Sequence, residues 1–418
     1  MTLIASTILA LLAVAYNPSM MGAAAAFLIV ILVGLGRREK EVINPYYLFL
    51  STPISLLLYS DTVSQIFLPP IEEEVQLIIV GAIFAYLAGL LSYGGVGRTF
   101  KAKPSLAYHF YIILGLGIIP HLAGAVTNGF PLLAGDVNAS RENYFLPVIG
   151  QFTVFLPVAM LIAFRRKDRS LIILSVALNA FLSAMVVSRF SIMFSALFFF
   201  YGYFRYDGKS SLGIRPSHLV AAAAISIPFL FEAIFAARES ASQTAYAWRR
   251  ELEFGSVFLN TYGDYTYLPY IYLTAPWSNF SYLFEVRTEM TYGARSIYSI
   301  ASFLQIEQFL NFEPRVVRNA TFNTHAFPAD FYLDFGVLGV VLLSFLLGFL
   351  VKWSYIAAQK SSDVLQEAIW MSFAFASFML FFSNHFTGLS YPLISLALFS
   401  VYRFVRRLAR ARPQHQRA

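Results

Sequence analysis

The chain of 418 residues has no cysteine, and few of its residues carry a charge. Without cysteine it forms no disulfide, holds no thiolate metal site and uses no cysteine nucleophile. Charged residues make up 13% of the chain, about half of the roughly 25% that is usual in soluble domains. The GxxxxGK[ST] phosphate loop and the zinc-protease motif HExxH are also missing. An ATP-driven or zinc-protease activity therefore lacks support.

Apolar and aromatic side chains are abundant instead, at 58% and 17% of the chain. Twelve apolar runs approach the length that crosses a hydrocarbon core of about 30 Å. They span approximately 2–16, 19–35, 45–60, 75–93, 106–127, 146–164, 170–188, 190–204, 219–237, 329–351, 364–383 and 388–403. These runs predict an all-α polytopic integral membrane protein with about 12 transmembrane helices. We expect one membrane domain over 1–418, with residues 2–16 retained as a span because they lack a basic signal-peptide flank.

Basic residues follow every even-numbered run, and they continue into the tail at 404–418. Loops rich in lysine and arginine stay in the cytoplasm. The alternation therefore predicts that both termini and all of these loops are cytoplasmic. The net charge of +7 is a signal of membrane topology, so we predict no nucleic-acid partner.

One connection is much longer than the others. Residues 238–328 separate the ninth run from the tenth on the outer side and are rich in tyrosine, phenylalanine and tryptophan. Short helices are expected near 245–258 and 298–309. A segment of this length is able to fold over the membrane surface, so we expect it to cap the outer face.

The topology leaves nine basic residues outside, and all nine are arginine, while all seven lysines lie inside. The outer arginines are Arg141, Arg189, Arg238, Arg249, Arg250, Arg287, Arg295, Arg315 and Arg318. The planar fork of arginine donors fits diphosphate oxygens better than a lysine does. The alternative is pairing with glutamates of the same segment, which we favour for Arg238, Arg249 and Arg250.

Arg141 and Arg189 differ from the other outer arginines because each lies beside a predicted span. Arg141 belongs to the loop 129–143, and Arg189 to the tight junction 187–190 between the seventh and eighth runs. A charge at the membrane boundary is costly and indicates a function. The alternative is a side chain that anchors the helix end by reaching toward water. We expect both arginines to be functional.

Polar residues also gather in segment 315–336, at the mouth of the tenth run. Its candidates are Arg315, Arg318, Asn323, His325, Asp330 and Asp334. The pKa of histidine is ordinarily near 6.5, which suits His325 to proton transfer. Asp330 and Asp334 are four residues apart and share a face if the helix has begun. No other carboxylates converge, so we predict no metal.

Two further histidines and one acidic run receive ordinary interpretations. His121 lies inside the fifth run and His385 within 383–386. Both are interpreted as packing residues. The acidic run 72–74 is interpreted as a solvated charge cluster.

Several of these segments together resemble the O-antigen polymerase (Wzy-type), or oligosaccharide repeat-unit polymerase, family of bacterial inner membranes. The matching pieces are Gly129-Phe-Pro-Leu-Leu with Asp136-Val-Asn-Ala-Ser-Arg141, Ser188-Arg189, Tyr272-Leu-Thr-Ala-Pro-Trp-Ser-Asn-Phe280, and Asn323-Thr-His with Asp334-Phe-Gly-Val-Leu-Gly339. Their order and spacing agree over about 125–350. The many spans and the large late outer loop, periplasmic in this family, agree as well.

The resemblance implies a glycosyltransferase of the inner membrane that acts on the periplasmic side. Such enzymes join oligosaccharide repeat units carried on undecaprenyl diphosphate into O-antigen or a related surface polysaccharide. The implied partners are the lipid-linked donor and acceptor, and membrane lipid. A polysaccharide chain-length regulator is a further candidate partner. No nucleotide sugar or other cofactor is expected.

The resemblance also assigns roles to residues of this chain. Arg141 and Arg189 would hold the leaving diphosphate, whose growing charge a well-placed donor stabilises. His325 ranks first as the base for the acceptor hydroxyl, ahead of Asp330 and Asp334. The remaining expected substrate contacts are Arg287, Arg295, Arg318 and Asn323.

Three other functions compete with this interpretation. An O-antigen ligase uses the same chemistry, and only its acceptor, the lipid A core, differs. A flippase or transporter of lipid-linked sugar is expected to carry charges near the midplane of its spans. Only Glu232 meets that condition. A structural membrane subunit leaves the outer arginine and histidine group unexplained.

Overall fold

The computed structural model describes residues 20–39, 41–60, 70–94, 107–146, 149–206, 212–219, 221–222, 226, 233, 264–286, 289–304, 306–310, 324–361, 363–388, 397 and 400–401. Every regular element within these ranges is a helix. Those long and apolar enough to cross a membrane are Glu73–Ser92, Phe110–Leu133, Ile149–Arg166 and Pro328–Lys360. Shorter apolar helices are Met20–Gly36, Arg169–Met185 and Val364–Phe378. The predicted all-α membrane class is confirmed for this part of the chain.

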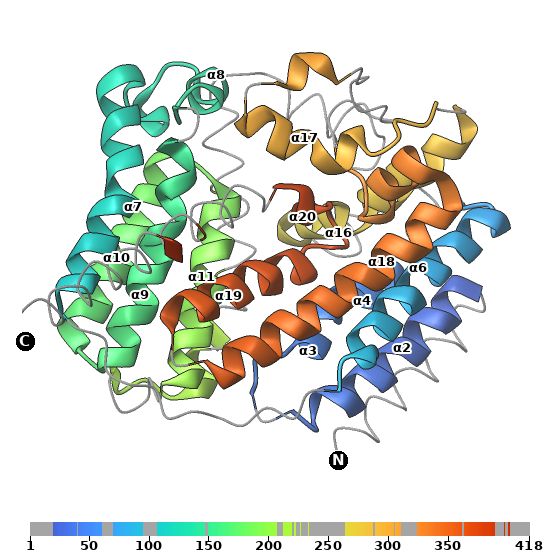
Figure 1. The fold of residues 1–418 in the computed structure, drawn as a ribbon, viewed down its shortest axis with the longest axis horizontal. Coiled ribbons are helices and arrows are strands. Elements are labelled where there is room, and N and C mark those ends of the chain that lie inside the picture. The colour runs from blue at the N-terminus through green and yellow to red at the C-terminus, as the bar shows by residue number, and fades with distance from the viewer. Residues whose placement is uncertain are drawn as a thin grey trace, which may run out of the picture.

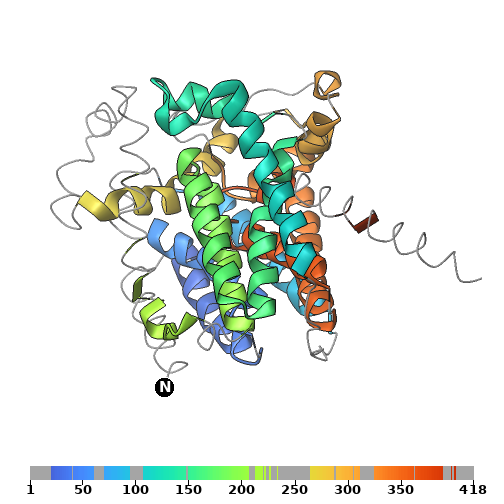
Figure 2. The ribbon, with the colours of Figure 1, turned by 90° about the vertical axis from the view of Figure 1, so that its left-hand side faces the viewer.

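A first group of helices lies on the left of Figure 1 and faces the viewer in Figure 2. It consists of α7 (Ala107–Asn128), η2 (Ile149–Val154), α9 (Phe155–Arg166), α10 (Arg169–Met185) and α11 (Arg189–Arg205). The helix α9 packs against α7, α10 and α11. All its residues from Phe155 to Arg165 are buried. A helix that is apolar on every side belongs in the interior, so α9 is the centre of this group.

The second group consists of α2 (Met20–Gly36), α3 (Pro45–Phe49), α4 (Ser51–Tyr59), α6 (Glu73–Ser92) and α18 (Pro328–Lys360). The run predicted at 45–60 forms two helices instead of one, which meet at Leu50. Pro53 has no N–H to donate to Phe49, and its ring crowds that carbonyl. The proline therefore explains the break.

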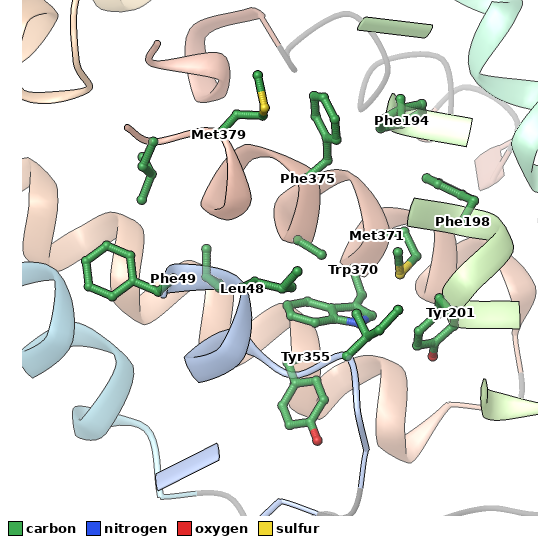
Figure 3. Close-up of a cluster of buried hydrophobic side chains, with 14 of the residues drawn as sticks. Leu48, Phe49, Phe194, Phe198, Tyr201, Tyr355, Trp370, Met371, Phe375 and Met379 are labelled. Carbon is green, nitrogen blue, oxygen red and sulfur yellow. The ribbon is translucent and has the colours of Figure 1, made fainter. Parts of the chain in front are cut away.

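The helix α19 (Val364–Phe378) joins the two groups, because it packs against α18 on one side and against α9 and α11 on the other. Figure 3 shows its buried side chains at the centre of the cluster. The Trp370 ring lies 5.0 Å from that of Tyr355 in α18. The Phe375 ring lies 5.2 Å from that of Phe194 in α11. The core is thus continuous across the molecule.

The helices α6 and α18 run side by side in Figure 1 and approach each other closely. A Cβ atom on Gly89 would overlap the Phe345 carbonyl oxygen, and one on Gly348 would overlap the Tyr86 carbonyl oxygen. Each helix therefore places a glycine against the backbone of the other. In a membrane, small residues of this kind permit close dispersion contact between helices.

The long connection expected as a cap is partly built into the bundle. Its helix α16 (Asp264–Glu285) packs against α4 and α18. There Trp277 is fully buried, and its indole N–H donates to Ser55 Oγ at 2.7 Å. The helix expected near 298–309 is α17 (Ala294–Phe303), followed by η3 (Glu307–Phe309). The one expected near 245–258 lies outside the described residues.

Ion pairs brace the helix ends far from α17. Arg205 of α11 pairs with Glu41, and Lys352 of α18 pairs with Glu39. Both glutamates belong to the short connection between α2 and α3. The ends of the two helix groups are therefore joined through one loop.

Several expectations fall outside the described residues. These are the span at 2–16, most of the spans at 219–237 and 388–403, and the tail at 404–418. The full number of spans stays a prediction.

Replacing Gly348 by leucine should separate α6 from α18. Because overpacking a tight contact typically costs about 1–3 kcal/mol, we expect the variant to unfold at a clearly lower temperature in detergent. The matched control is Gly81→Leu in α6, where an added Cβ meets nothing within 4 Å. Equal melting temperatures for the two variants would show that this contact is not tight.

Candidate functional site

A kink in α18 organises the end of the molecule that carries the candidate residues. Helical geometry is interrupted at Phe335 and Gly336. Gly336 has φ 63° and ψ −156°, a combination that is essentially restricted to glycine. The interruption frees two carbonyl groups of the helix: that of Leu333 accepts from the Thr291 amide, and that of Asp334 from the Tyr292 amide. The chain before α17 is thereby fastened to the kink.

The Asp334 carboxylate holds the start of α17. It accepts from Thr291 Oγ1 at 2.5 Å, from the Arg295 amide at 3.0 Å and from Ser296 N and Oγ at 2.8 and 2.6 Å. The residue is completely buried. A carboxylate at a helix N-terminus satisfies free N–H groups and complements the helix dipole. Asp334 thus has a clear structural role, which makes it a weaker candidate base than His325.

Arg189 occupies the first position of α11. The helix is capped by Ser188, whose Oγ accepts from the Ser191 amide at 3.2 Å. A cation at a helix N-terminus is opposed by the helix dipole, by about 0.3–1 kcal/mol. The dipole and the guanidinium both attract an anion placed there. An arginine at this position therefore costs the helix some stability but is well placed to bind an anionic group.

Tyr272 and His385 complete the surroundings of Arg189. The guanidinium donates to the Tyr272 hydroxyl and lies 4.9 Å from the centre of its ring. Together with His385 they border a pocket of about 100 Å³. Its other walls are apolar: Phe190, Met193, Met379, Phe381 and Phe382. An apolar pocket with an arginine and a histidine beside it suits a ligand with an anionic head and a hydrocarbon tail.

Packing brings the loop of Arg141 toward Arg189. The short helix α8 (Val137–Glu142) begins at Asp136, whose carboxylate accepts from the Ala139 amide at 3.0 Å. Val137 is buried against Val187. These valines lie four residues before Arg141 and two before Arg189, so both arginines belong to one end of the bundle.

The turn before Arg189 stores backbone strain. Val187 has φ 54°, which is costly for a β-branched side chain, by about 1–3 kcal/mol. The neighbouring contact with Val137 holds it in place. Strain of this kind persists where the surrounding structure fixes a conformation, often at a functional site. Here it sets the start of α11.

His325 lies just before α18 and is 6% exposed. Hydrogen bonds tie its neighbours to two sides of the pocket. The Ala326 amide donates to the Pro276 carbonyl at 3.1 Å, one turn along α16 from Tyr272. The Phe327 amide donates to the Leu380 carbonyl at 3.0 Å, beside pocket residues Phe381 and Phe382. His325 therefore belongs to the same region as Arg189.

The other described candidates lie around this region. Arg295 is buried in α17, which packs against α20 (His385–Gly388) as Figure 1 shows. Asp330 is half-buried in the first turn of α18. Arg287, Arg318 and Asn323 lie outside the described residues.

Two residues of the pocket were not assigned to the site from the sequence. Tyr272 appeared only within the family-like segment, and His385 was interpreted as a packing histidine. His385 does pack, with its ring 5.4 Å from Phe190. The sequence signal for it was a histidine close to the outer end of the eleventh run. Its proximity to Arg189 depends on the arrangement of α11 and α19, which sequence spacing does not contain.

Within the described residues, no three His, Asp or Glu side chains are grouped so that they could hold a metal ion. Comparison of the chain with protein-family models, curated proteins and solved structures gives no match. The geometry of the site and the chemistry of its residues therefore carry the functional argument.

Replacing Asp334 by alanine should loosen α17. Four hydrogen-bond donors lose their acceptor, and each buried donor left unsatisfied costs about 1–3 kcal/mol. We expect faster hydrogen–deuterium exchange across residues 294–303 and a lower melting temperature. Asp330→Ala, one turn earlier in the same helix, is the control and should leave exchange in α17 unchanged. Unchanged exchange in Asp334→Ala would contradict the capping role.

Proposed function

We propose that the chain is a glycosyltransferase that joins oligosaccharide repeat units carried on undecaprenyl diphosphate. The observation that carries this proposal is the pocket beside Arg189. Its apolar walls suit an isoprenoid chain, and its guanidinium at a helix N-terminus suits a diphosphate. Few other biological ligands combine a long hydrocarbon with a diphosphate.

The proposed reaction needs stabilisation of the negative charge on the departing diphosphate and a base for the acceptor hydroxyl. The acceptor hydroxyl oxygen forms a bond to the anomeric carbon of the donor sugar. The bond from that carbon to the diphosphate oxygen breaks, and its electron pair leaves with the diphosphate. Arg189, with Arg141 from the neighbouring loop and Arg295 from α17, neutralises the departing charge. The hydroxyl proton passes to a base.

His325 is the proposed base. It is the candidate whose neighbours are fixed to the walls of the pocket, and an imidazole is suited to proton transfer near neutral pH. Asp330, half-buried in the first turn of α18, is the second candidate. His385 is assigned to the diphosphate side because it borders the same pocket as Arg189.

The position of buried charges favours an enzyme over a transporter. In the described helices, the buried ionic side chains Arg165, Arg295, Asp334 and Glu367 lie within two turns of a helix end. Lys352, two turns from the end of α18, is paired with Glu39. A transporter of lipid-linked sugar is expected to place charges near the midplane.

The cellular setting belongs to the proposal. We place the chain in the bacterial inner membrane with about 12 spans and both termini in the cytoplasm. The segment 238–328 and the pocket then face the periplasm, where lipid-linked repeat units are joined. The partners are the lipid-linked donor and acceptor and a polysaccharide chain-length regulator. We propose that neither a cofactor nor a metal takes part.

Replacing Arg189 by glutamine should abolish polymer formation. Loss of one well-placed donor to a developing charge slows the reaction about 100- to 1000-fold, so the ladder of long chains should disappear on gels of surface polysaccharide. The matched control is Arg169→Gln. Arg169 also occupies the first position of a helix, α10, but it is exposed and lies at the other end of the bundle. Its ladder should be normal.

The same gels distinguish the polymerase from its closest rival. In a strain lacking the gene, lipid A core that carries a single repeat unit indicates a polymerase. Core without any repeat unit, together with accumulated lipid-linked polymer, indicates a ligase. A full ladder in the strain with Arg189→Gln would contradict the proposed site.

Replacing His325 by glutamine tests the base. General-base catalysis contributes about 100- to 10,000-fold, so the rate of polymerisation by purified protein should fall by at least the lower figure while lipid binding is kept. His218, which is exposed, offers the control His218→Gln with unchanged rate. A normal rate in His325→Gln would assign the base to another residue, with Asp330 the next to test.

A further inference from the structure

A second cavity lies in the first helix group, where α7, η2, α9, α10 and α11 meet; Figure 2 views the bundle from this side. Its volume is about 50 Å³. The polar residues in its wall are His121, Thr153, Asn179, Ser183, Ser191 and Ser195. Polar side chains in the interior of an apolar bundle are costly unless each finds hydrogen-bond partners. They point to a polar occupant.

His121 gives an independent indication of that occupant. The residue is 3% exposed, and its Nδ1 atom has no hydrogen-bond partner among the residues that the structure describes. Its ring is held by Phe145, with ring centres 5.2 Å apart. A buried ring nitrogen without a partner costs about 1–3 kcal/mol. A ligand or water in the cavity removes that cost.

The wall selects the chemistry of the occupant. None of the described residues in the wall carries a charged side chain, so these residues offer nothing to balance an ion. Its groups are hydroxyls, an amide and an imidazole. Ser195 Oγ donates to Asn179 Oδ1 at 3.0 Å and keeps lone pairs to accept. Thr153 Oγ1 likewise donates to Gly150. Such a wall matches neutral hydroxyl groups, which both donate and accept.

The cavity adjoins the pocket of Arg189. Phe190 is in the wall of both, so the polar cavity and the proposed diphosphate pocket are neighbours along the start of α11. Ser191 follows it in α11 and faces the polar side. A sugar linked to a diphosphate at Arg189 therefore has its hydroxyl groups within reach of the cavity.

We infer that this cavity is a sugar subsite, which receives neutral hydroxyl substituents of the sugar next to the diphosphate. The inference rests on the proposed function. A volume of about 50 Å³ takes one or two groups of the size of water, whose share of liquid volume is about 30 Å³. The sugar ring stands at the mouth, while His121, Thr153 and Ser195 contact its substituents.

The test compares a sugar-free lipid with sugar-bearing lipids on full-length protein in lipid nanodiscs, with binding measured by native mass spectrometry. The probes are undecaprenyl diphosphate and the same lipid carrying glucose, galactose or N-acetylglucosamine. We expect wild type to prefer at least one sugar-bearing lipid. His121→Phe fills the cavity, and Thr153→Val removes one hydroxyl. Each should weaken binding of that sugar-bearing lipid about tenfold and leave binding of the sugar-free lipid unchanged.

The control is Thr127→Val in α7. Its hydroxyl also donates to a carbonyl of its own helix, that of Ala123 at 2.9 Å, but it is exposed and outside the cavity. It should bind both lipids as wild type does. Melting temperatures near that of wild type establish that the variants fold, and Thr153→Val, the smaller change, remains informative if His121→Phe does not.

Each outcome separates the subsite from the proposed function. If wild type prefers no sugar-bearing lipid, or if the cavity variants bind both lipids normally, the cavity holds water only and the inference is wrong. If Arg189→Gln, measured alongside, binds both lipids as tightly as wild type, the diphosphate pocket is wrong as well. Weakening of both lipids by Arg189→Gln, and of the sugar-bearing lipid alone by the cavity variants, supports both.

Discussion

The kink of α18 at Phe335 and Gly336 is the constraint on which the candidate site depends. In a straight helix, the carbonyls of Leu333 and Asp334 would accept hydrogen bonds from amides of the next turn of the same helix. Because the kink turns them outward, they bind the chain at Thr291 and Tyr292. The Asp334 side chain then starts α17, which carries Arg295 and packs on α20. One break in one helix thus sets the position of a second helix.

A kink holds other elements in place only if the helix that contains it is itself fixed. Gly89 and Gly348 help to fix α18 because they bring the backbones of α6 and α18 together. Lys352 adds an ion pair with Glu39 near the far end of α18. Arg205 makes the corresponding pair with Glu41 for α11. The far ends of α11 and α18 are therefore tied to one loop, while Arg189 begins α11 and His325 lies just before α18 at their near ends.

Hydropathy and charge predicted much of this arrangement, because helix length and the cost of burying charge depend on local sequence. Runs such as 75–93 and 106–127 correspond closely to α6 and α7, and Arg189 was found from its position between two runs. Burial of α16 was not predicted, because it depends on a hydrogen bond from Trp277 to Ser55, which is distant in the sequence. The kink at Gly336 was not predicted, because hydropathy describes the run 329–351 as one continuous span. The polar cavity of His121 was missed because its walls come from four separate segments.

In the proposed function, the surroundings of Arg189 determine which anions the pocket prefers. The guanidinium lies over the Tyr272 ring and next to Phe190 and Phe382, where the low local dielectric strengthens its attraction for a negative charge. The same apolar walls gain nothing from a hydrated inorganic phosphate, which loses its water on entering. An anion joined to a hydrocarbon chain avoids that conflict, because the chain covers the apolar wall while the head meets the cation. In the proposed function, charge and apolar surface therefore act together, and their combination favours amphiphilic anions over soluble ones.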